Sequence, residues 1–227
     1  MKSHNGWWLL DHEEDDGYNK WTLEKNNWQN NLAKEAAFCS PGDRVAIDVG
    51  ACYGAMSHAF AEFFDKVHAF EIIPTFIEPL KKNLENTPNV EIHNTGLYHK
   101  KHTVIARQYS YSGYSKIYSY ESDVFRRNTK LTAGQRVISD NEVDVLPLDD
   151  FKIKNVDLIK IDAEGTEGLI LIGAMKTINK YKPLLLVEVG AKCNREPLRW
   201  MLEDVLGYNV IKRKRRDWFC LPKEKNE

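Results

Sequence analysis

From residue 43 onward, the chain alternates short apolar runs with stretches whose apolar residues recur at helical spacing. The apolar runs lie at Val45–Val49, Lys66–Phe70, Val90–His93, 158–161 and 184–189, and the helical stretches at 55–64, 76–86, 165–179 and 196–206. A last pair of apolar runs over 208–221 predicts a terminal antiparallel hairpin. Strands and helices that alternate in this way predict an α/β fold, with a mostly parallel seven-stranded sheet and helices on both faces.

Two segments depart from this rhythm. Residues 1–42 are polar but contain the tryptophans Trp7, Trp8, Trp21 and Trp28. Because aromatic residues are scarce in disordered tails, we expect this segment to be an extension packed on a core domain of residues 43–227. Residues 99–145 are rich in Tyr and Ser and lack helical periodicity. They predict an insertion of short antiparallel strands and loops.

The composition argues against several classes of protein. The formal net charge of −1 creates no overall field that would recruit nucleic acid or an anionic membrane. No apolar run approaches the roughly 20 residues of a membrane helix. The four cysteines form no C-x-x-C pair, and the start of the chain lacks the apolar core of a secretion signal. We therefore expect reduced thiols, a cytoplasmic location and no membrane partner.

Three polar signals fall at the ends of predicted strands, where open α/β sheets bind their ligands. The first is Asp48 with the turn that follows it, in which Gly50 and Gly54 allow a tight bend and the close approach of a ligand. The second is Glu71, whose carboxylate can accept two hydrogen bonds from a ribose diol. The third is Asn94, whose amide could meet an adenine edge. The pattern D-x-G-x-x-x-G suits the cationic end of S-adenosylmethionine better than a dinucleotide, which favours G-x-G-x-x-G.

Longer stretches resemble the FkbM family of methyltransferases. They are VAIDVGACYGAMS at 45–57, HAFEIIP at 68–74, NTGL at 94–97, VLPLDD at 145–150, VDLIKIDAEGTE at 156–167 and LLVE at 185–188. Residues 5–14 are similar to the start of the short versions common in phage genomes, which would place the protein in the host cytoplasm. Two positions depart from the family pattern: Cys52 stands where the family has Asn, and Ile73 lies between Glu71 and Pro74.

The resemblance implies a Rossmann-like class I methyltransferase fold, with S-adenosylmethionine as the cofactor and a hydroxyl, often of a sugar, as the acceptor. The residues that would hold the cofactor are Asp48, Gly50, Gly54 and Glu71, to which we add Ala51 from the same turn and Asn94.

The segment around the end of the fourth core strand contains the candidate catalytic residues. Strand alternation places Lys160 and Asp162 on one side, and Glu164 falls on the turn that follows. Methylation of an alcohol needs in-line approach and a base for the hydroxyl proton. Asp162 or Glu164 could be that base, or Lys160 if burial lowers its pKa, and Glu188 could orient the hydroxyl. Glu164 and Glu167 also suit a helix start, since carboxylates favour its positive end.

The terminal hairpin is expected to present five adjacent cations at its tip, near the substrate mouth. They are Lys212, Arg213, Lys214, Arg215 and Arg216. Such a run could attract phosphate, including that of nucleic acid, or could be a solvated turn.

Two further groups of residues allow more than one interpretation. The tyrosines within 109–120 could stack on a sugar or a base, or could simply cover a hairpin surface. His93, His99 and His102 lie close in sequence, but without a carboxylate or cysteine that would complete a metal site, so we expect no metal.

Three kinds of function stay open. The first is O-methylation of a saccharide or nucleotide-sugar, and the second is methylation of the ribose or base of a nucleic acid. The third is a nucleotide-binding module without catalysis, or a nicotinamide enzyme. Affinity for S-adenosylmethionine against NAD separates the third from the others, and the salt dependence of oligonucleotide binding separates the first two. N-methylation would favour an N/D-P-P-Y-like element after the fourth strand, which this sequence lacks.

Overall fold

A computed structural model describes residues 1–4, 6–10, 27–40, 42, 44–110, 115–118, 136–190, 193–212 and 216–224. Several residues considered above lie outside these ranges: Trp21, three of the tyrosines within 109–120 (Tyr111, Tyr114 and Tyr120), and Arg213 to Arg215. The side chains of Trp28, Tyr118 and Lys212 are likewise outside the description. Within the described residues, no helix is both long enough and apolar enough to cross a membrane.

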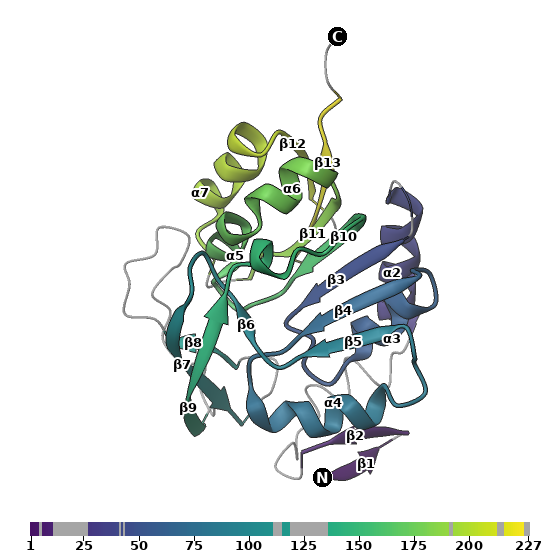
Figure 1. Ribbon diagram of the computed structural model, residues 1–227, viewed down its shortest axis with the longest axis vertical. Helices are drawn as coiled ribbons and strands as arrows, with labels where there is room; N and C mark the ends of the chain where they lie inside the picture. The colour runs from purple at the N-terminus through teal and green to yellow at the C-terminus, as the bar shows by residue number, and fades with distance from the viewer. Residues whose placement is uncertain are drawn as a thin grey trace.

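A seven-stranded sheet forms the centre of the molecule (Figure 1). In spatial order its strands are β12 (Tyr208–Lys212), β13 (Asp217–Pro222), β11 (Leu184–Glu188), β10 (Val156–Ile161), β3 (Val45–Val49), β4 (Lys66–Phe70) and β5 (Val90–His93). The pairs from β11 to β5 are all parallel, whereas β13 runs antiparallel to both β11 and β12. The expected α/β fold with a mostly parallel sheet is confirmed, and the sheet is mixed because the return strand of the terminal hairpin lies inside it.

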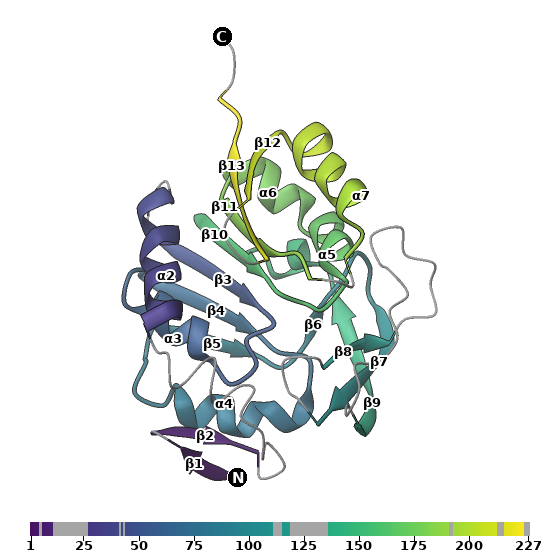
Figure 2. The ribbon, with the colours of Figure 1, turned by 180° about the vertical axis from the view of Figure 1, so that it is seen from behind.

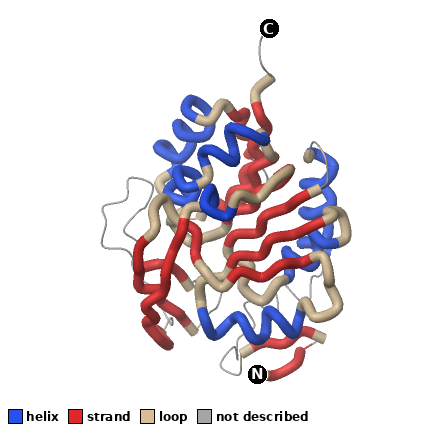
Figure 3. Tube along the Cα trace, viewed as in Figure 1, coloured by secondary structure: helices blue, strands red, loops and turns tan. Residues whose placement is uncertain are grey.

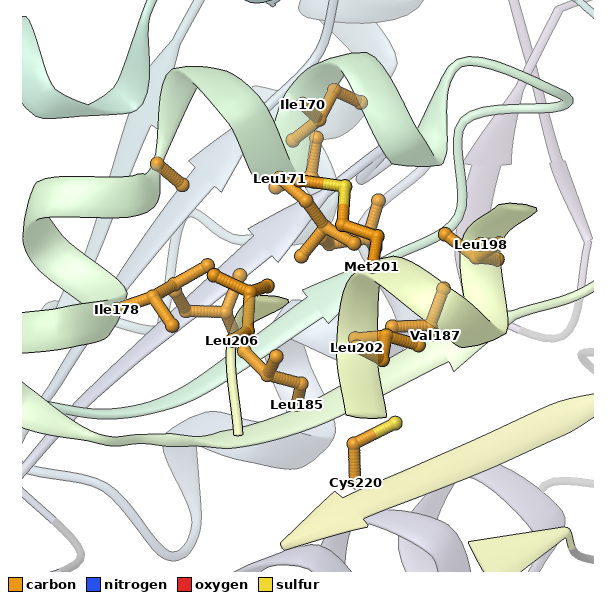
Figure 4. Packing of buried hydrophobic residues seen from close by; sticks show 14 of the residues in the cluster. Ile170, Leu171, Ile178, Leu185, Val187, Leu198, Met201, Leu202, Leu206 and Cys220 are labelled. Atoms are coloured by element: carbon orange, nitrogen blue, oxygen red, sulfur yellow. The ribbon is translucent and has the colours of Figure 1, made fainter. Parts of the chain in front are cut away.

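Helices cover both faces of this sheet (Figures 2 and 3). One layer contains α2 (Asn27–Cys39), α3 (Ala55–Ala61) and α4 (Ile77–Asn83), and the other contains α5 (Glu167–Gly173), α6 (Met175–Tyr181), α7 (Arg195–Trp200) and the π-helical η5 (Met201–Val205). The side chains of β11 alternate between the two layers: Leu184 and Leu186 join the α2–α3 cluster, and Leu185 and Val187 join the other. Figure 4 shows Leu185 and Val187 beneath the side chains of α5, α6, α7 and η5.

The helix expected over 165–179 is interrupted, because α5 ends at Gly173 and α6 begins at Met175. A Cβ on Gly173 would lie 1.9 Å from the backbone oxygen of Tyr98. The glycine therefore allows the chain after the third parallel strand to pass directly against the helix. This contact joins segments far apart in sequence, so helical periodicity alone could not predict it.

The insertion forms a second sheet of four strands, in the order β6 (Gly96–Leu97), β9 (Val137–Leu146), β7 (His102–Tyr109) and β8 (Lys116–Tyr118). The β9–β7 and β7–β8 pairs are antiparallel, as expected, whereas β6 pairs with β9 in parallel. β9 spans 10 residues and is longer than the short strands expected. The chain returns from β9 through the 3-10 helix η4 (Leu148–Phe151) to β10, so the second sheet stands where a crossover helix would otherwise follow β5.

The N-terminal segment contacts the core at two places. The hairpin of β1 (Lys2–His4) and β2 (Trp7–Leu9) lies on α4, where the Asn83 side chain accepts a hydrogen bond from the Trp8 N–H at 2.6 Å and donates to the Trp8 carbonyl at 3.0 Å. Helix α2 buries Ala33, Ala36 and Ala37 against α3 and the sheet.

Candidate active site

A cavity opens at the carboxyl edge of the parallel strands, where β3, β4 and β10 end. Its lining comprises Val49, Gly50, Cys52, Phe70, Glu71, Ile72, Ile73, Phe76, Thr95, Gly96, Leu97, Ser115, Lys116, Ile117, Asp162, Ala163, Glu164, Thr166 and Ile170. Apolar side chains form most of the wall, and carboxylates lie at two places along it. Such a cavity suits a ligand with an aromatic part and a few polar groups.

The turn after β3 brings two segments of backbone into contact. Gly50 has φ +80°, and a Cβ there would lie 2.0 Å from the backbone oxygen of Asp162. A glycine at position 50 is therefore required both for its backbone conformation and for the close approach of the turn after β10.

Two other expected cofactor residues of this turn lie in the protein interior. Gly54 caps α3 in the left-handed region with φ +91°, and a Cβ there would lie 2.8 Å from Leu80. Ala51 is buried among the side chains of α4 and β4. Neither residue lines the cavity, so both contribute to the conformation of the turn rather than to the cavity wall.

Glu71 lines the cavity at the end of β4 and is only 4% exposed. Its Oε2 accepts a hydrogen bond from the Cys52 N–H at 2.7 Å, and its Oε1 accepts one from the Ile73 N–H at 2.7 Å. Burial raises the pKa of Glu71 to about 7, although these backbone donors favour the charged form. A carboxylate oxygen accepts more than one hydrogen bond, so the fixed group retains the capacity to accept the two hydroxyls of a ribose.

Asp48 is fully buried and points away from the cavity. Its Oδ2 accepts a hydrogen bond from the Ser57 hydroxyl at 2.6 Å, and its Oδ1 lies 2.9 Å from the Lys160 ammonium. Lys160 also donates to the Gly50 carbonyl at 3.2 Å. These contacts hold the glycine turn in place from the sheet below.

Lys160 was expected to act as a base only if burial lowered its pKa. Burial does oppose the charge, but the carboxylates of Asp48 and Asp162 outweigh it and hold the pKa of Lys160 above its ordinary value. The condition for a base role is therefore not met. Asp48, the larger of the two effects, comes from β3, so the residue type and its position on β10 could not reveal the raised pKa of Lys160.

A second, smaller cavity adjoins the first and is rich in carboxylates. Its lining comprises Asp162, Glu164, Gly165, Glu167, Glu188, Gly190 and Cys193. Asp162 and Glu164 line both cavities, so the two meet there. Glu164 occupies this position with a left-handed φ of 54°. The structure thus brings together three of the four expected catalytic residues, Asp162, Glu164 and Glu188.

Asp162 and Glu188 lie close enough to share a hydrogen bond. The charge of Asp162, together with burial, raises the pKa of Glu188 well above its usual range. Glu188 therefore holds a proton near neutral pH and donates it toward Asp162.

Glu167 supports the turn, as expected for a carboxylate at a helix start. It is 2% exposed, and its Oε1 accepts a hydrogen bond from the Gly165 N–H at 2.9 Å. Burial raises its pKa to about 7.

The structure adds wall residues that the motifs did not indicate. Asn94 is exposed and absent from the cavity lining, whereas its neighbour Thr95 lines the wall. Lys116 and Ile117 of β8 in the inserted sheet also line the cavity, as does Ser115 just before that strand. The only sequence signal for this contribution to the cavity wall is that the insertion follows the NTGL stretch. Strand pairing within 99–145 joins residues far apart in sequence, so motifs could not show which strand reaches the cavity.

The described residues that flank the basic run lie beside the carboxylate cavity, at the edge of the sheet where the tip of the terminal hairpin is expected. Glu188, the last residue of β11, pairs with Asp217 at the start of β13. The Arg216 carbonyl accepts a hydrogen bond from the Val189 N–H at 2.7 Å. Gly190, which lines the carboxylate cavity, lies near the exposed Arg216 side chain, whose guanidinium would be 3.8 Å from a Cβ built on that glycine.

Comparison with known proteins agrees with this geometry. The family model of the methyltransferase FkbM domain matches residues 48–208, from the buried aspartate of β3 to the first residue of β12. The chain belongs to the FkbM methyltransferase family. The family assignment makes this a methyltransferase domain with S-adenosylmethionine as its cofactor. No curated protein matches the chain.

A solved structure shares the fold of this FkbM domain. A crystal structure of the FkbM methyltransferase of Methylobacillus flagellatus superposes with a TM-score of 0.53 and 19% identity, covering 78% of this chain and 42% of that chain. The present chain thus spans less than half the length of that relative. An rRNA methylase of Streptococcus thermophilus (TM-score 0.47, 10% identity, coverage 85% and 95%) is also similar. So is a putative methyltransferase of Streptococcus mutans solved with SAH (TM-score 0.47, 12% identity, coverage 83% and 93%).

The cavity of the FkbM domain fits this cofactor. Glu71 presents fixed carboxylate oxygens suited to a ribose, and Phe70, Ile72 and Phe76 supply apolar surface suited to a purine. Asp162 and Glu164 lie where a cationic group would be stabilised.

Proposed function

We propose that this domain transfers a methyl group from S-adenosylmethionine to a hydroxyl of a saccharide or nucleotide-sugar. The proposal rests mainly on the junction of the two cavities at Asp162 and Glu164. One cavity has the features expected of the cofactor site, and the other is lined by carboxylates. Carboxylates accept hydrogen bonds from hydroxyl groups and repel phosphates, so the second cavity favours a neutral polyol over a nucleic-acid backbone.

When bound, the cofactor supplies an electrophilic methyl carbon on a cationic sulfur. The residues at the junction would then orient the acceptor and take its proton. We assign the base to Asp162, because the neutral Glu188 donates a hydrogen bond to it and the Lys160 ammonium lies 3.7 Å from its Oδ2. These contacts fix the carboxylate in position before the acceptor arrives. Glu164, on the turn, would bind a second hydroxyl of the sugar.

Arg216 supports the nucleotide-sugar form of this proposal. Its exposed side chain lies near Gly190, at the rim of the carboxylate cavity. A sugar bound at the mouth of that cavity could therefore carry a phosphate that reaches the Arg216 guanidinium. The same residue keeps nucleic acid as the second candidate, since a basic hairpin tip at the substrate edge also suits a phosphate backbone.

Methyl transfer from isotope-labelled S-adenosylmethionine to a panel of free sugars, nucleotide-sugars and oligonucleotides tests the proposal. We expect alkali-stable label on a sugar hydroxyl of the first two classes. Label on an oligonucleotide, with binding that weakens steeply as salt is raised, would replace the saccharide proposal with the nucleic-acid one.

The variants Asp162→Asn and Glu164→Gln separate the two assigned roles. Loss of the base should lower kcat by about 10²–10⁴-fold in Asp162→Asn. Glu164→Gln should mainly raise KM for the acceptor. Equal kcat in Asp162→Asn and the wild type would remove Asp162 from the chemistry.

A further inference from the structure

A cluster of two histidines and a glutamate lies on the face of β4 and β5, and none of the three residues lines either cavity. The two strands pair in parallel, with His68 opposite Glu91 and Phe70 opposite His93. His68 Nδ1 lies 2.9 Å from His93 Nε2. The Glu91 carboxylate lies 3.6 Å from His68 Nδ1 through Oε2 and 3.7 Å from His93 Nε2 through Oε1.

The second sheet does not cross this face, although His68 within it is only 6% exposed. Figure 1 looks onto β3, β4 and β5, and among the described elements no helix crosses β4 and β5 on this side. Phe151 of η4 packs edge-on against His93, with ring centroids 5.4 Å apart, and borders the cluster. Glu91 remains half exposed, with 49% of its side-chain surface accessible, so an ion could enter from solvent beside it.

The three ligand atoms have the separations that a small metal ion requires. Zn²⁺ binds imidazole nitrogen and carboxylate oxygen at about 2.0–2.2 Å, which places the ligands of a tetrahedral ion about 3.3 Å apart. The observed separations of 2.9, 3.6 and 3.7 Å lie around that value. His68 and His93 therefore need to move apart by only a few tenths of an ångström.

The protonation states also suit a metal. Burial, aided by the nearby Lys66 charge, lowers the pKa of His68 to about 4, and burial lowers the pKa of His93 as well. Both imidazoles are neutral near pH 7, and the ammonium of Lys66, 2.6 Å from Glu91 Oε2, holds that carboxylate charged. The hydrogen bond between His68 Nδ1 and His93 Nε2 requires one N–H, so that proton must move to the other nitrogen of its ring before both atoms can bind the metal.

We propose that His68, Glu91 and His93 form a binding site for a first-row transition-metal dication of the Zn²⁺ type, with water as the fourth ligand. Two imidazoles and one carboxylate favour such ions over Mg²⁺ or Ca²⁺, which prefer oxygen ligands. The ion would join the edge strand β5 to β4. It would also fix His93 against Phe70, whose ring stacks on it at a centroid distance of 4.4 Å and lines the cofactor cavity. The proposed site is therefore a structural metal site that stabilises the sheet beside the cofactor pocket.

Calorimetric titration of the metal-free chain with ZnCl₂ tests the site. The wild type should bind one equivalent with micromolar affinity or tighter, and the midpoint of thermal unfolding should rise with added Zn²⁺. His68→Asn and His93→Asn should each weaken binding by at least about tenfold. His102→Asn is the matched control, because His102 Nδ1 contacts the Lys100 carbonyl on the other sheet and should bind like the wild type.

A second variant keeps the proposal testable if the histidine variants unfold. Lys66 competes with the metal for Glu91, so Lys66→Met should bind Zn²⁺ several-fold more tightly than the wild type. Co²⁺ in the same site should give the intense visible absorption of tetrahedral coordination. The proposal is overturned if the wild type binds no equivalent of Zn²⁺, if both histidine variants fold and bind like the wild type, or if Lys66→Met binds more weakly.

Discussion

Two residues at the carboxyl edge adopt left-handed backbone conformations although neither is glycine: Cys52 with φ 52° and Glu164 with φ 54°. Such a conformation costs about 1–3 kcal/mol for most residues, and Asn tolerates it best after glycine. This explains physically why the family pattern has Asn where this chain has Cys52. The Cys52 N–H still donates to Glu71, so this backbone conformation positions the Glu71 carboxylate whichever side chain residue 52 has.

The first prediction concerns this position. Cys52→Asn should raise the free energy of unfolding by about 0.5–1 kcal/mol, because the new residue fits the left-handed conformation. Cys52→Val should lower it by about 1–2 kcal/mol, because a β-branched side chain clashes there. Urea denaturation of the two variants and the wild type measures both differences. Equal stability of the Asn and Val variants would show that the turn is not held at this φ.

The second prediction concerns the buried ion pair beneath the glycine turn. Lys160→Met leaves the fully buried Asp48 without its cation, and should lower the free energy of unfolding by roughly 3–5 kcal/mol. The double variant Asp48→Asn/Lys160→Met removes both charges and should recover part of that loss. Urea denaturation in a double-mutant cycle measures the coupling. A loss below about 1 kcal/mol in the single variant would mean that solvent reaches Asp48.

At the scale of elements, the strands of the parallel sheet were the most predictable part. The bounds of β3, β4 and β5 match the expected runs, because each run contains apolar residues that pack in the interior and is followed by a glycine or a polar residue at the sheet edge. The same logic located Glu71, Asp162 and Glu164, since each follows such a run.

The elements that the sequence did not predict depend on contacts between distant segments. The interruption between α5 and α6 depends on Tyr98 passing against Gly173. The contribution of Lys116 and its neighbours to the cavity depends on how β8 pairs within the inserted sheet. The cluster of His68, Glu91 and His93 is a third case, because His93 lies beside His68 of the neighbouring strand and Glu91, rather than beside His99 and His102 as grouped along the chain. Apolar periodicity and local motifs contain no information on such pairings.

The third prediction concerns the N-terminal hairpin, which Asn83 joins to α4. Besides its two bonds to Trp8, the Asn83 side chain donates to the Tyr53 carbonyl at 2.9 Å. Asn83→Ala leaves these backbone groups without a partner, which costs about 1–3 kcal/mol, and should release β2 locally. Amide hydrogen exchange at Trp8 and Leu9 should then become faster by at least about fivefold. Glu85→Ala, an exposed position on the same segment, is the control and should leave the exchange unchanged.

At the scale of the whole molecule, buried titratable groups give the fourth prediction. The pKa of His68 is lowered to about 4, so between about pH 6.5 and 4 the unfolded chain binds a proton there and the folded chain does not. Stability is therefore lost as the pH falls through this window, by on the order of 3 kcal/mol for this group. Glu71 and Glu167, with pKa values raised to about 7, act in the opposite direction.

Comparison with a variant isolates the histidine from these carboxyl groups. In the presence of a chelator, the loss of unfolding free energy from pH 7 to pH 4.5 should be smaller in His68→Asn than in the wild type by about 2–3 kcal/mol. An identical loss in both proteins would show that His68 titrates normally in the fold.

The most direct test of the central claim is calorimetric titration with S-adenosylhomocysteine at pH 8, where Glu71 is charged. The wild type should bind one equivalent with micromolar affinity. Glu71→Ala, and Glu71→Gln with its similar size, should bind about 10- to 150-fold more weakly, as expected for the loss of hydrogen bonds to a charged acceptor. Thermal unfolding of each variant confirms that it is folded. If the wild type does not bind, or if the folded variants bind as tightly as the wild type, the cavity at the end of β3 and β4 is not the cofactor site described here.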